Sequence, residues 1–174
     1  MKKLLTIAVA AMCAALAQAT SVDWGYGGDV MNSDGSDYAD NGTAWVIYLG
    51  NETDLSPITV DNTGNISVGD YSVAATASVS SDGMVNGGAS FTSTTSNNGN
   101  YVLFAAYEGS DGWYYGNTGV QSVSGLTSDN TTTAEVNFGN SPLNLSTPAP
   151  VPEPTSLALL ALGLAALGLK RKVA

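Results

Sequence analysis

Short apolar segments separated by tight turns dominate the middle of this chain. Four dipeptides accept the positive φ angle that a hairpin turn requires. In chain order they are Asn41-Gly42, Asp82-Gly83, Asn98-Gly99 and Asp111-Gly112. Residues 44–49 (AWVIYL) and 101–107 (YVLFAAY) are rich in aromatic and β-branched side chains. Apolar runs this short favour buried strands over helices.

Alternating polarity predicts a further strand over residues 71–79 (YSVAATASV), with the odd-numbered residues on one face and the even-numbered ones on the other. Shorter candidate strands cover residues 22–26, 58–60, 89–92, 113–115, 120–123 and 133–138. Residues 21–150 contain no convincing amphipathic helix. The sequence therefore predicts an all-β domain over residues 20–139, as an antiparallel β-sandwich or a jelly-roll-like fold.

Residues 140–150 (NSPLNLSTPAP) have a different composition, with three prolines among Ser, Thr and Asn. Such a segment is typical of an extended, weakly structured linker. We expect it to separate the domain from the end of the chain.

Charge is distributed unusually. All five basic residues lie near the two ends, and residues 4–169 contain fifteen Asp and Glu with no Lys, Arg or His. Neutralising the phosphates of a nucleic acid requires Lys or Arg, so nucleic-acid binding is excluded. Because residues 4–169 contain no His or Lys, Ser-His-Asp triads, histidine metal centres and Schiff-base lysines are also excluded. The single cysteine, Cys13, lies near the N-terminus, so thiol catalysis and thiolate metal sites in the domain are excluded as well.

A pair of carboxyl groups is the catalytic machinery that this composition still permits, as in glycoside hydrolases. The only glutamates in the domain are Glu52, Glu108 and Glu135. Their spacing does not mark any two as facing each other across a cleft. We therefore expect a protein that is not an enzyme.

The densest acidic cluster contains Asp34, Asp37 and Asp40, within NSDGSDYADNG. Ca²⁺ takes six to eight oxygen ligands, which Asp, Asn and Ser side chains can supply. The spacing differs from that of an EF-hand loop. The cluster is either a calcium site or a solvated surface loop.

Three consecutive aromatic residues, Trp113, Tyr114 and Tyr115, form a second candidate site. Exposed aromatic rings stack against sugar faces, so this cluster could contact a glycan. In a small β-domain such rings also pack in the core, and alternation along a strand would point Tyr114 away from the other two.

The N-terminus has the three parts of a secretory signal peptide. Lys2 and Lys3 precede an apolar stretch over residues 4–17, which ends in the small-x-small site formed by Ala17, Gln18 and Ala19. We expect signal peptidase to remove residues 1–19.

The C-terminal tail is also apolar, without a polar side chain over residues 157–169. A helix over residues 155–169 would be about 22 Å long, which is short against the roughly 30 Å hydrocarbon core of a bilayer. Lys170, Arg171 and Lys172 follow at once, as at the cytoplasmic end of a stop-transfer segment.

Residues 151–174 contain Pro152-Glu153-Pro154, then the apolar segment, then the basic cluster. With these three parts in this order, the tail resembles a PEP-CTERM sorting signal. The resemblance implies an exported protein of a Gram-negative bacterium, held in the inner membrane by its C-terminal helix. It also implies processing near Pro152-Glu153-Pro154 by an exosortase, a membrane-embedded cysteine transpeptidase, followed by transfer to the cell surface or the extracellular matrix.

Together these features predict an acidic surface or biofilm-matrix protein with a structural or adhesive, non-enzymatic role. Its expected partners are exosortase and signal peptidase as processing enzymes, the membrane, and exopolysaccharide. One alternative is a carbohydrate-binding module that uses Trp113, Tyr114 and Tyr115. A less favoured one is a small carboxylate-dependent glycosidase.

Overall fold

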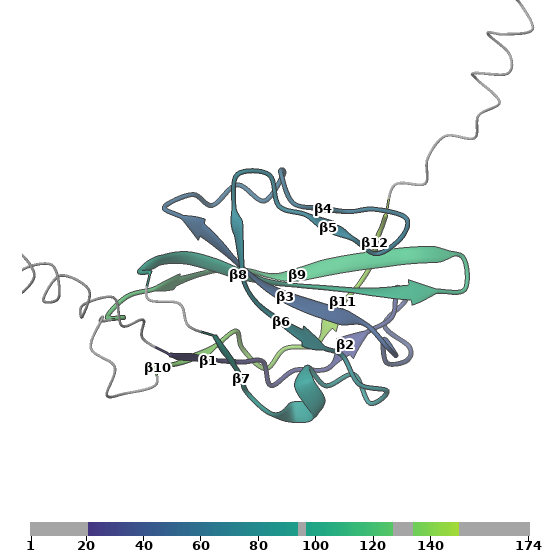
Figure 1. Ribbon diagram of the computed structural model, residues 1–174. Helices are drawn as coiled ribbons and strands as arrows, with labels where there is room; N and C mark the ends of the chain where they lie inside the picture. Colours follow the sequence, from purple (N-terminus) through teal and green to yellow (C-terminus); the bar gives the residue numbers. More distant parts are fainter. Residues whose placement is uncertain (1–20, 94–96, 127–133, 150–174) are drawn as a thin grey trace, which may run out of the picture.

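The structure, a computed structural model, describes residues 21–93, 97–126 and 134–149, which are built mainly from strands (Figure 1). The strands are β1 (Val22–Gly25), β2 (Val30–Met31), β3 (Thr43–Gly50), β4 (Thr59–Val60), β5 (Ile66–Ser67), β6 (Ser72–Ser78), β7 (Phe91–Ser93), β8 (Gly99–Gly109), β9 (Gly112–Val123), β10 (Ala134–Asn137), β11 (Leu143–Asn144) and β12 (Thr147–Pro148). The one helical element in these ranges is a 3-10 turn, η1 (Asn86–Gly88). The prediction of an all-β fold is confirmed.

A five-stranded antiparallel sheet, in the order β12-β9-β8-β3-β6, forms the middle of the fold. β8 and β9 form a long hairpin whose turn, Ser110-Asp111, is closed by the Gly109–Gly112 pair. The two apolar runs predicted as strands are the neighbouring central strands β3 and β8. Both of their faces are covered by other parts of the chain, which explains why the runs are continuously apolar.

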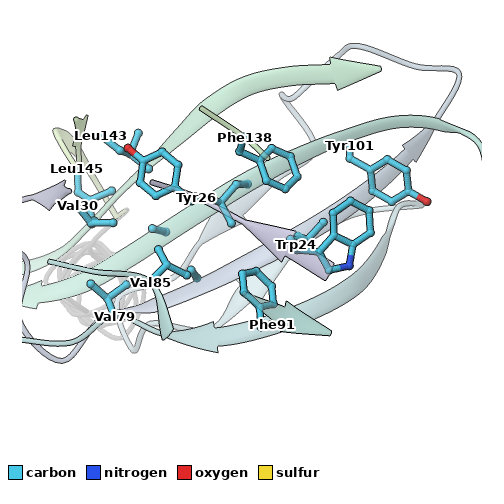
Figure 2. Packing of buried hydrophobic residues seen from close by; sticks show 14 of the residues in the cluster. Trp24, Tyr26, Val30, Val79, Val85, Phe91, Tyr101, Phe138, Leu143 and Leu145 are labelled. Carbon is cyan, nitrogen blue, oxygen red and sulfur yellow. The ribbon is translucent and has the colours of Figure 1, made fainter. Parts of the chain in front are cut away.

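On one face of this sheet lies the main core, closed by a three-stranded sheet in the order β10-β1-β7 (Figures 1 and 2). The Trp24 ring is fully buried there, with its centroid 4.8 Å from that of Tyr101 and 5.9 Å from that of Phe138. Side chains from the two sheets meet in a single apolar layer.

A smaller core lies on the opposite face, under the β4–β5 hairpin. Trp45, Ile47 and Phe104 point to this side, and Ile58 and Val60 cover them. The five-stranded sheet is therefore the middle of three layers, which fixes a side for every residue of β3 and β8.

Not every strand pair is antiparallel, so that part of the prediction is wrong. β1 pairs with β10 and β2 pairs with β11 in parallel. Both pairs join segments from opposite ends of the domain, and a parallel pair requires such a long connection. The strands β2, β5, β11 and β12, which were not predicted, have two residues each, too few to show an alternating pattern.

The alternation predicted for residues 71–79 is interrupted by a β-bulge. Val46 pairs with Ala75 whereas the next residue, Ile47, pairs with Val73, so Ala74 is an extra residue in β6. Tyr71 consequently packs on the smaller core while Ala77 packs on the main core. The prediction that all odd-numbered residues share one face is wrong.

The segment predicted as a linker, residues 140–150, differs from that expectation over its described part. Within residues 143–149, β11 pairs with β2 in a separate two-stranded sheet, and β12 adds to the edge of the five-stranded sheet. Leu143, Leu145 and Ala149 are buried. Leu143 and Leu145 are spaced for one face of a strand. Pro148 lies in β12, at the edge of the five-stranded sheet, where proline is tolerated.

The predicted signal peptide with its cleavage site at Ala17 and Ala19, and the predicted helix over residues 155–169, lie outside the described residues. Within the described ranges no helix is long and apolar enough to cross a membrane.

Candidate functional site

Residues 143–149, here called the C-terminal strap, cross directly over β9. A Cβ atom added at Gly116 would lie 2.9 Å from the carbonyl oxygen of Asn144 and 3.2 Å from Leu145 Cδ2. The strap can approach the strand this closely because residue 116 has no side chain.

Beyond Gly116 the strap pairs with β9 in antiparallel register. Thr147 lies opposite Tyr115 and Pro148 lies opposite Tyr114. The Ala149 N–H then donates a 2.8 Å hydrogen bond to the Trp113 carbonyl oxygen. The strap therefore runs toward the tip of the β8–β9 hairpin, and β12 lies beside β9 in Figure 1. Ala149 is the last residue of the domain that the structure describes.

The next residue opens a recognisable segment. The family model described as the PEP-CTERM protein-sorting motif matches residues 150–172. The tail is a PEP-CTERM sorting motif. The match contains Pro152, Glu153 and Pro154 together with the basic cluster Lys170, Arg171 and Lys172. It confirms the resemblance seen in the sequence.

The PEP-CTERM motif indicates an exported protein that an exosortase-type system sorts. The match is confined to the tail and does not extend into the β-domain. No curated protein and no solved structure matches the chain.

An acidic depression of about 330 Å³ lies near the same hairpin tip. Its lining consists of Asn32, Ser33, Asp34, Asp37, Tyr38, Asp40 and residues 107–111. Asp34, Asp37 and Asp40 thus share one depression, as their clustering in the sequence suggested. Glu108 and Asp111 line the same depression, and no pattern in the sequence predicts that they do. The Asp111-Gly112 dipeptide predicts a turn but does not indicate which loop packs against that turn.

Hydrogen bonds connect the aspartate loop to the hairpin across the acidic depression and also stabilise each of these two segments. The Ser33 N–H donates to the Tyr107 hydroxyl at 3.0 Å, and the Tyr114 hydroxyl donates to an Asp111 carboxylate oxygen at 2.8 Å. Asp34 accepts from the Ser36 N–H at 2.9 Å and from the Ser36 hydroxyl at 2.5 Å. These bonds lower the pKa of Asp34. They favour the ionised carboxylate and hold it within its own turn.

Metal binding has no geometric support in this depression. Across residues 21–93, 97–126 and 134–149, no group of three or more acidic side chains is arranged to hold a metal ion. Calcium binding by Asp34, Asp37 and Asp40 stays a prediction. Adding EDTA should lower the melting temperature if these residues hold Ca²⁺.

The three consecutive aromatic residues are divided between the two faces of β9. Trp113 and Tyr115 pack on the smaller core, and Tyr115 stacks on Phe104 with centroids 6.3 Å apart. Tyr114 packs on the main core beside Tyr107, with centroids 5.9 Å apart. All three rings are half-buried. They do not form one flat platform for a sugar, and the predicted contact could involve at most one face at a time.

The three glutamates are also separated. Glu108 lines the acidic depression, whereas Glu52 lines a different one of about 350 Å³ beside Asp54, Asp70 and Tyr71. Glu135 lies on β10, opposite Asp23 of β1. None of the depressions described here is lined by two glutamates, whereas the acid and base of a glycosidase flank one scissile bond.

A smaller depression of about 220 Å³, not anticipated from the sequence, lies beside Tyr26. Its lining includes Asn117, Thr118, Phe138 and Ser141. The Tyr26 hydroxyl donates a hydrogen bond to the Ser141 carbonyl oxygen. Burial, together with the nearby Asp29 carboxylate, raises the pKa of Tyr26 to about 12. The proton of this hydroxyl is engaged by the Ser141 carbonyl oxygen.

Proposed function

We propose that this exported, exosortase-sorted protein has a structural or adhesive role at the cell surface or in the extracellular matrix of a Gram-negative bacterium. The observation that carries the proposal is the PEP-CTERM motif at residues 150–172, directly after a folded β-domain. An N-terminal signal peptide and a membrane-held intermediate complete this route, with signal peptidase and exosortase as processing enzymes.

The chemistry of the domain supports a non-enzymatic role. Residues 4–169 contain no Lys, Arg or His, which leaves carboxyl groups as the main candidates for a general acid or base. The described glutamates lie apart. Several aspartates serve as caps of their own turns, as Asp61 does for Thr63 and Asn65. Such a domain, which we class as a β-sandwich, suits display of a stable surface.

A carbohydrate-binding module is the second candidate, and the depression beside Tyr26 favours it. An aromatic ring there lies among the hydroxyl and amide groups of Thr118 and Asn117, the kind of lining that binds neutral sugars. Pull-down of the purified domain with exopolysaccharide tests this function. Binding that is lost in Asn117→Ala and kept in Trp113→Ala would assign it to this depression, and no binding by the wild-type domain would contradict it.

Export and sorting are tested by fractionating the native host and determining the C-terminal residues of the protein by mass spectrometry. We expect surface or matrix protein that lacks residues 170–174. A variant without residues 150–174 should be absent from that fraction. Recovery of surface protein with intact Lys170 and Ala174 would contradict exosortase processing and indicate a permanent anchor.

The structural role needs its own test. A matched strain should carry the signal peptide and tail fused to an unrelated neutral domain. Loss of matrix cohesion or surface attachment in that strain, with normal delivery of the fusion, would support a role for the β-domain. Unchanged cohesion and attachment would contradict it.

A further inference from the structure

We propose that the C-terminal strap fixes the N-terminal limit of tail processing at Ala149, and that the folded domain, which ends only a few residues before Pro152-Glu153-Pro154, slows the enzyme's approach to that motif. The inference rests on the proposed sorting by an exosortase-type enzyme. It assigns to residues 143–149 a role in presenting the motif.

Burial and backbone pairing close the strap in the folded domain. Leu145 is fully buried, and Ala149 is 5% exposed. The Leu143 N–H donates to the Asp29 carbonyl oxygen at 2.9 Å, and the Leu145 N–H donates to that of Met31 at 3.1 Å. An enzyme that takes an extended peptide into its cleft would have to break these bonds first. Residues 143–149 are therefore closed to such an enzyme in the folded domain.

The strap joins segments that are far apart in the sequence. Leu143 pairs with Val30 of β2, whereas Thr147 pairs with Tyr115 of β9. Both partners must be in place before the strap can close. Closure of the strap thus depends on folding of the domain as a whole, and an unfolded chain lacks this limit.

Only two residues, Pro150 and Val151, separate Ala149 from Pro152. A fully extended chain spans at most about 11 Å between the Cα atoms of Ala149 and Pro152. An enzyme acting at Pro152-Glu153-Pro154 must therefore approach the hairpin tip closely. The folded domain obstructs that approach sterically. Because the domain lies so close to the cleavage site along the chain, it slows processing.

The covalent step itself is ordinary acyl transfer. One peptide bond at the motif breaks, and the released C-terminal segment takes a proton to form a new amino terminus. The upstream acyl carbon passes through a thioester with the enzyme's cysteine and then bonds to the oxygen of water or the nitrogen of an acceptor amine. The strap takes no part in this chemistry and determines only which peptide bonds are reached.

A spacer tests the steric part of the proposal. A six-residue spacer of Gly and Ser is inserted between Ala149 and Pro150 of the full chain. Pulse labelling in the native host then measures the rate at which the tail is lost. The control carries the same insertion between Gly87 and Gly88, where a side chain on Gly87 would meet open space. We expect faster tail loss with the spacer and an unchanged rate in the control. An unchanged or slower rate with the spacer would overturn the proposal.

A substitution in β9 that displaces the strap, while the strap's own sequence stays the same, tests whether the strap is protected from proteolysis. Gly116→Val would overlap Asn144, whereas Gln121→Val adds the same side chain at an exposed position of β9. In limited proteolysis of the purified full chain with a broad-specificity protease, we expect cleavage within residues 143–149 to rise about tenfold in Gly116→Val. The rate should not change in Gln121→Val. Equal cleavage of the strap in the wild type and Gly116→Val would contradict the proposal.

The mature C-terminus provides the remaining readout. We expect it at Ala149 or beyond, and an end within residues 143–148 would overturn the proposal. If the tail is never removed in the host, the proposed sorting fails, yet strap protection remains measurable in the purified chain. The two failures are therefore distinguishable.

Discussion

The backbone N–H of Ala149 donates a 2.8 Å hydrogen bond to the carbonyl oxygen of Trp113. This bond attaches the last described residue of the domain to the strand that leaves the β8–β9 hairpin. The PEP-CTERM motif begins one residue later. Folded domain and sorting motif are thus adjacent along the chain, with no spacer between them.

If the strap belongs to the fold, shortening its most buried side chain should be costly. Leu145 is fully buried in the main core, so we expect Leu145→Ala to lower the free energy of unfolding by about 2–5 kcal/mol. Urea denaturation of the purified domain measures this change. Ser146→Ala, at the adjacent exposed position, is the control and should cost little. A small effect of Leu145→Ala would show that the strap is loose in solution.

The two tryptophans Trp24 and Trp113 should differ in their contributions to stability. Trp24 is fully buried between Tyr101 and Phe138, and we expect Trp24→Ala to cost about 3–5 kcal/mol. Trp113 is half-buried, so Trp113→Ala should cost less. Chemical denaturation followed by far-UV circular dichroism gives both values. Equal losses would contradict the assignment of Trp24 to the main core.

Acid should remove the contribution of turn-capping carboxylates. Asp61 accepts hydrogen bonds from the Thr63 hydroxyl and from the Asn65 and Thr63 N–H groups, and these bonds lower its pKa from 3.8. Near pH 3.8 the Asp61 carboxyl group therefore binds fewer protons in the folded state than in the unfolded state. The stabilisation is present above pH 3.8 and is lost as the pH falls through the lowered pKa.

In Asp61→Asn the side chain keeps an acceptor oxygen but cannot titrate. We expect the melting temperature of this variant to fall less than that of the wild type below about pH 4. Thermal melts between pH 6 and pH 2.5 measure the difference. Parallel curves for the two proteins would show that the Asp61 carboxylate does not stabilise its turn.

Salt should stabilise the domain. Of the fifteen acidic residues, all but Glu153 precede Pro150, and residues 20–149 contain no Lys, Arg or His. Repulsion among these carboxylates destabilises the compact state, and salt screens it. We expect the melting temperature at pH 7 to rise between 0.01 M and about 0.5 M NaCl. A fall would point to attractive charge interactions that this composition does not provide.

Strands β3 and β8 show how far local reasoning extends. Their apolar runs were predicted because a strand covered on both faces must be continuously apolar. Strand β6 shows the limit: the extra Ala74 shifts every following residue to the other face. Nothing in YSVAATASV marks that position, because the bulge arises where β6 must match β3.

In the candidate site, too, contiguous sequence features could be predicted and contacts between distant segments could not. The PEP-CTERM motif was recognisable because its three parts are contiguous in the chain. For the acidic depression, the sequence predicted only the cluster of Asp34, Asp37 and Asp40, which are neighbours in sequence. Glu108 and Asp111 line it because the tip of the hairpin packs against the loop that carries the three aspartates, and that packing joins residues about 70 positions apart.

By itself, the sequence determined the all-β class, the central strands and the tail, since each depends on composition and order within a few residues. It also determined the absence of basic residues from the domain. Tertiary structure alone decided that residues 143–149 form a strap. Their pattern of Leu, Asn, Ser, Thr and Pro is also that of a linker, and the outcome depended on partners at Val30 and Gly116. Burial of Leu145 against those distant segments stabilises a pairing that no local preference encodes.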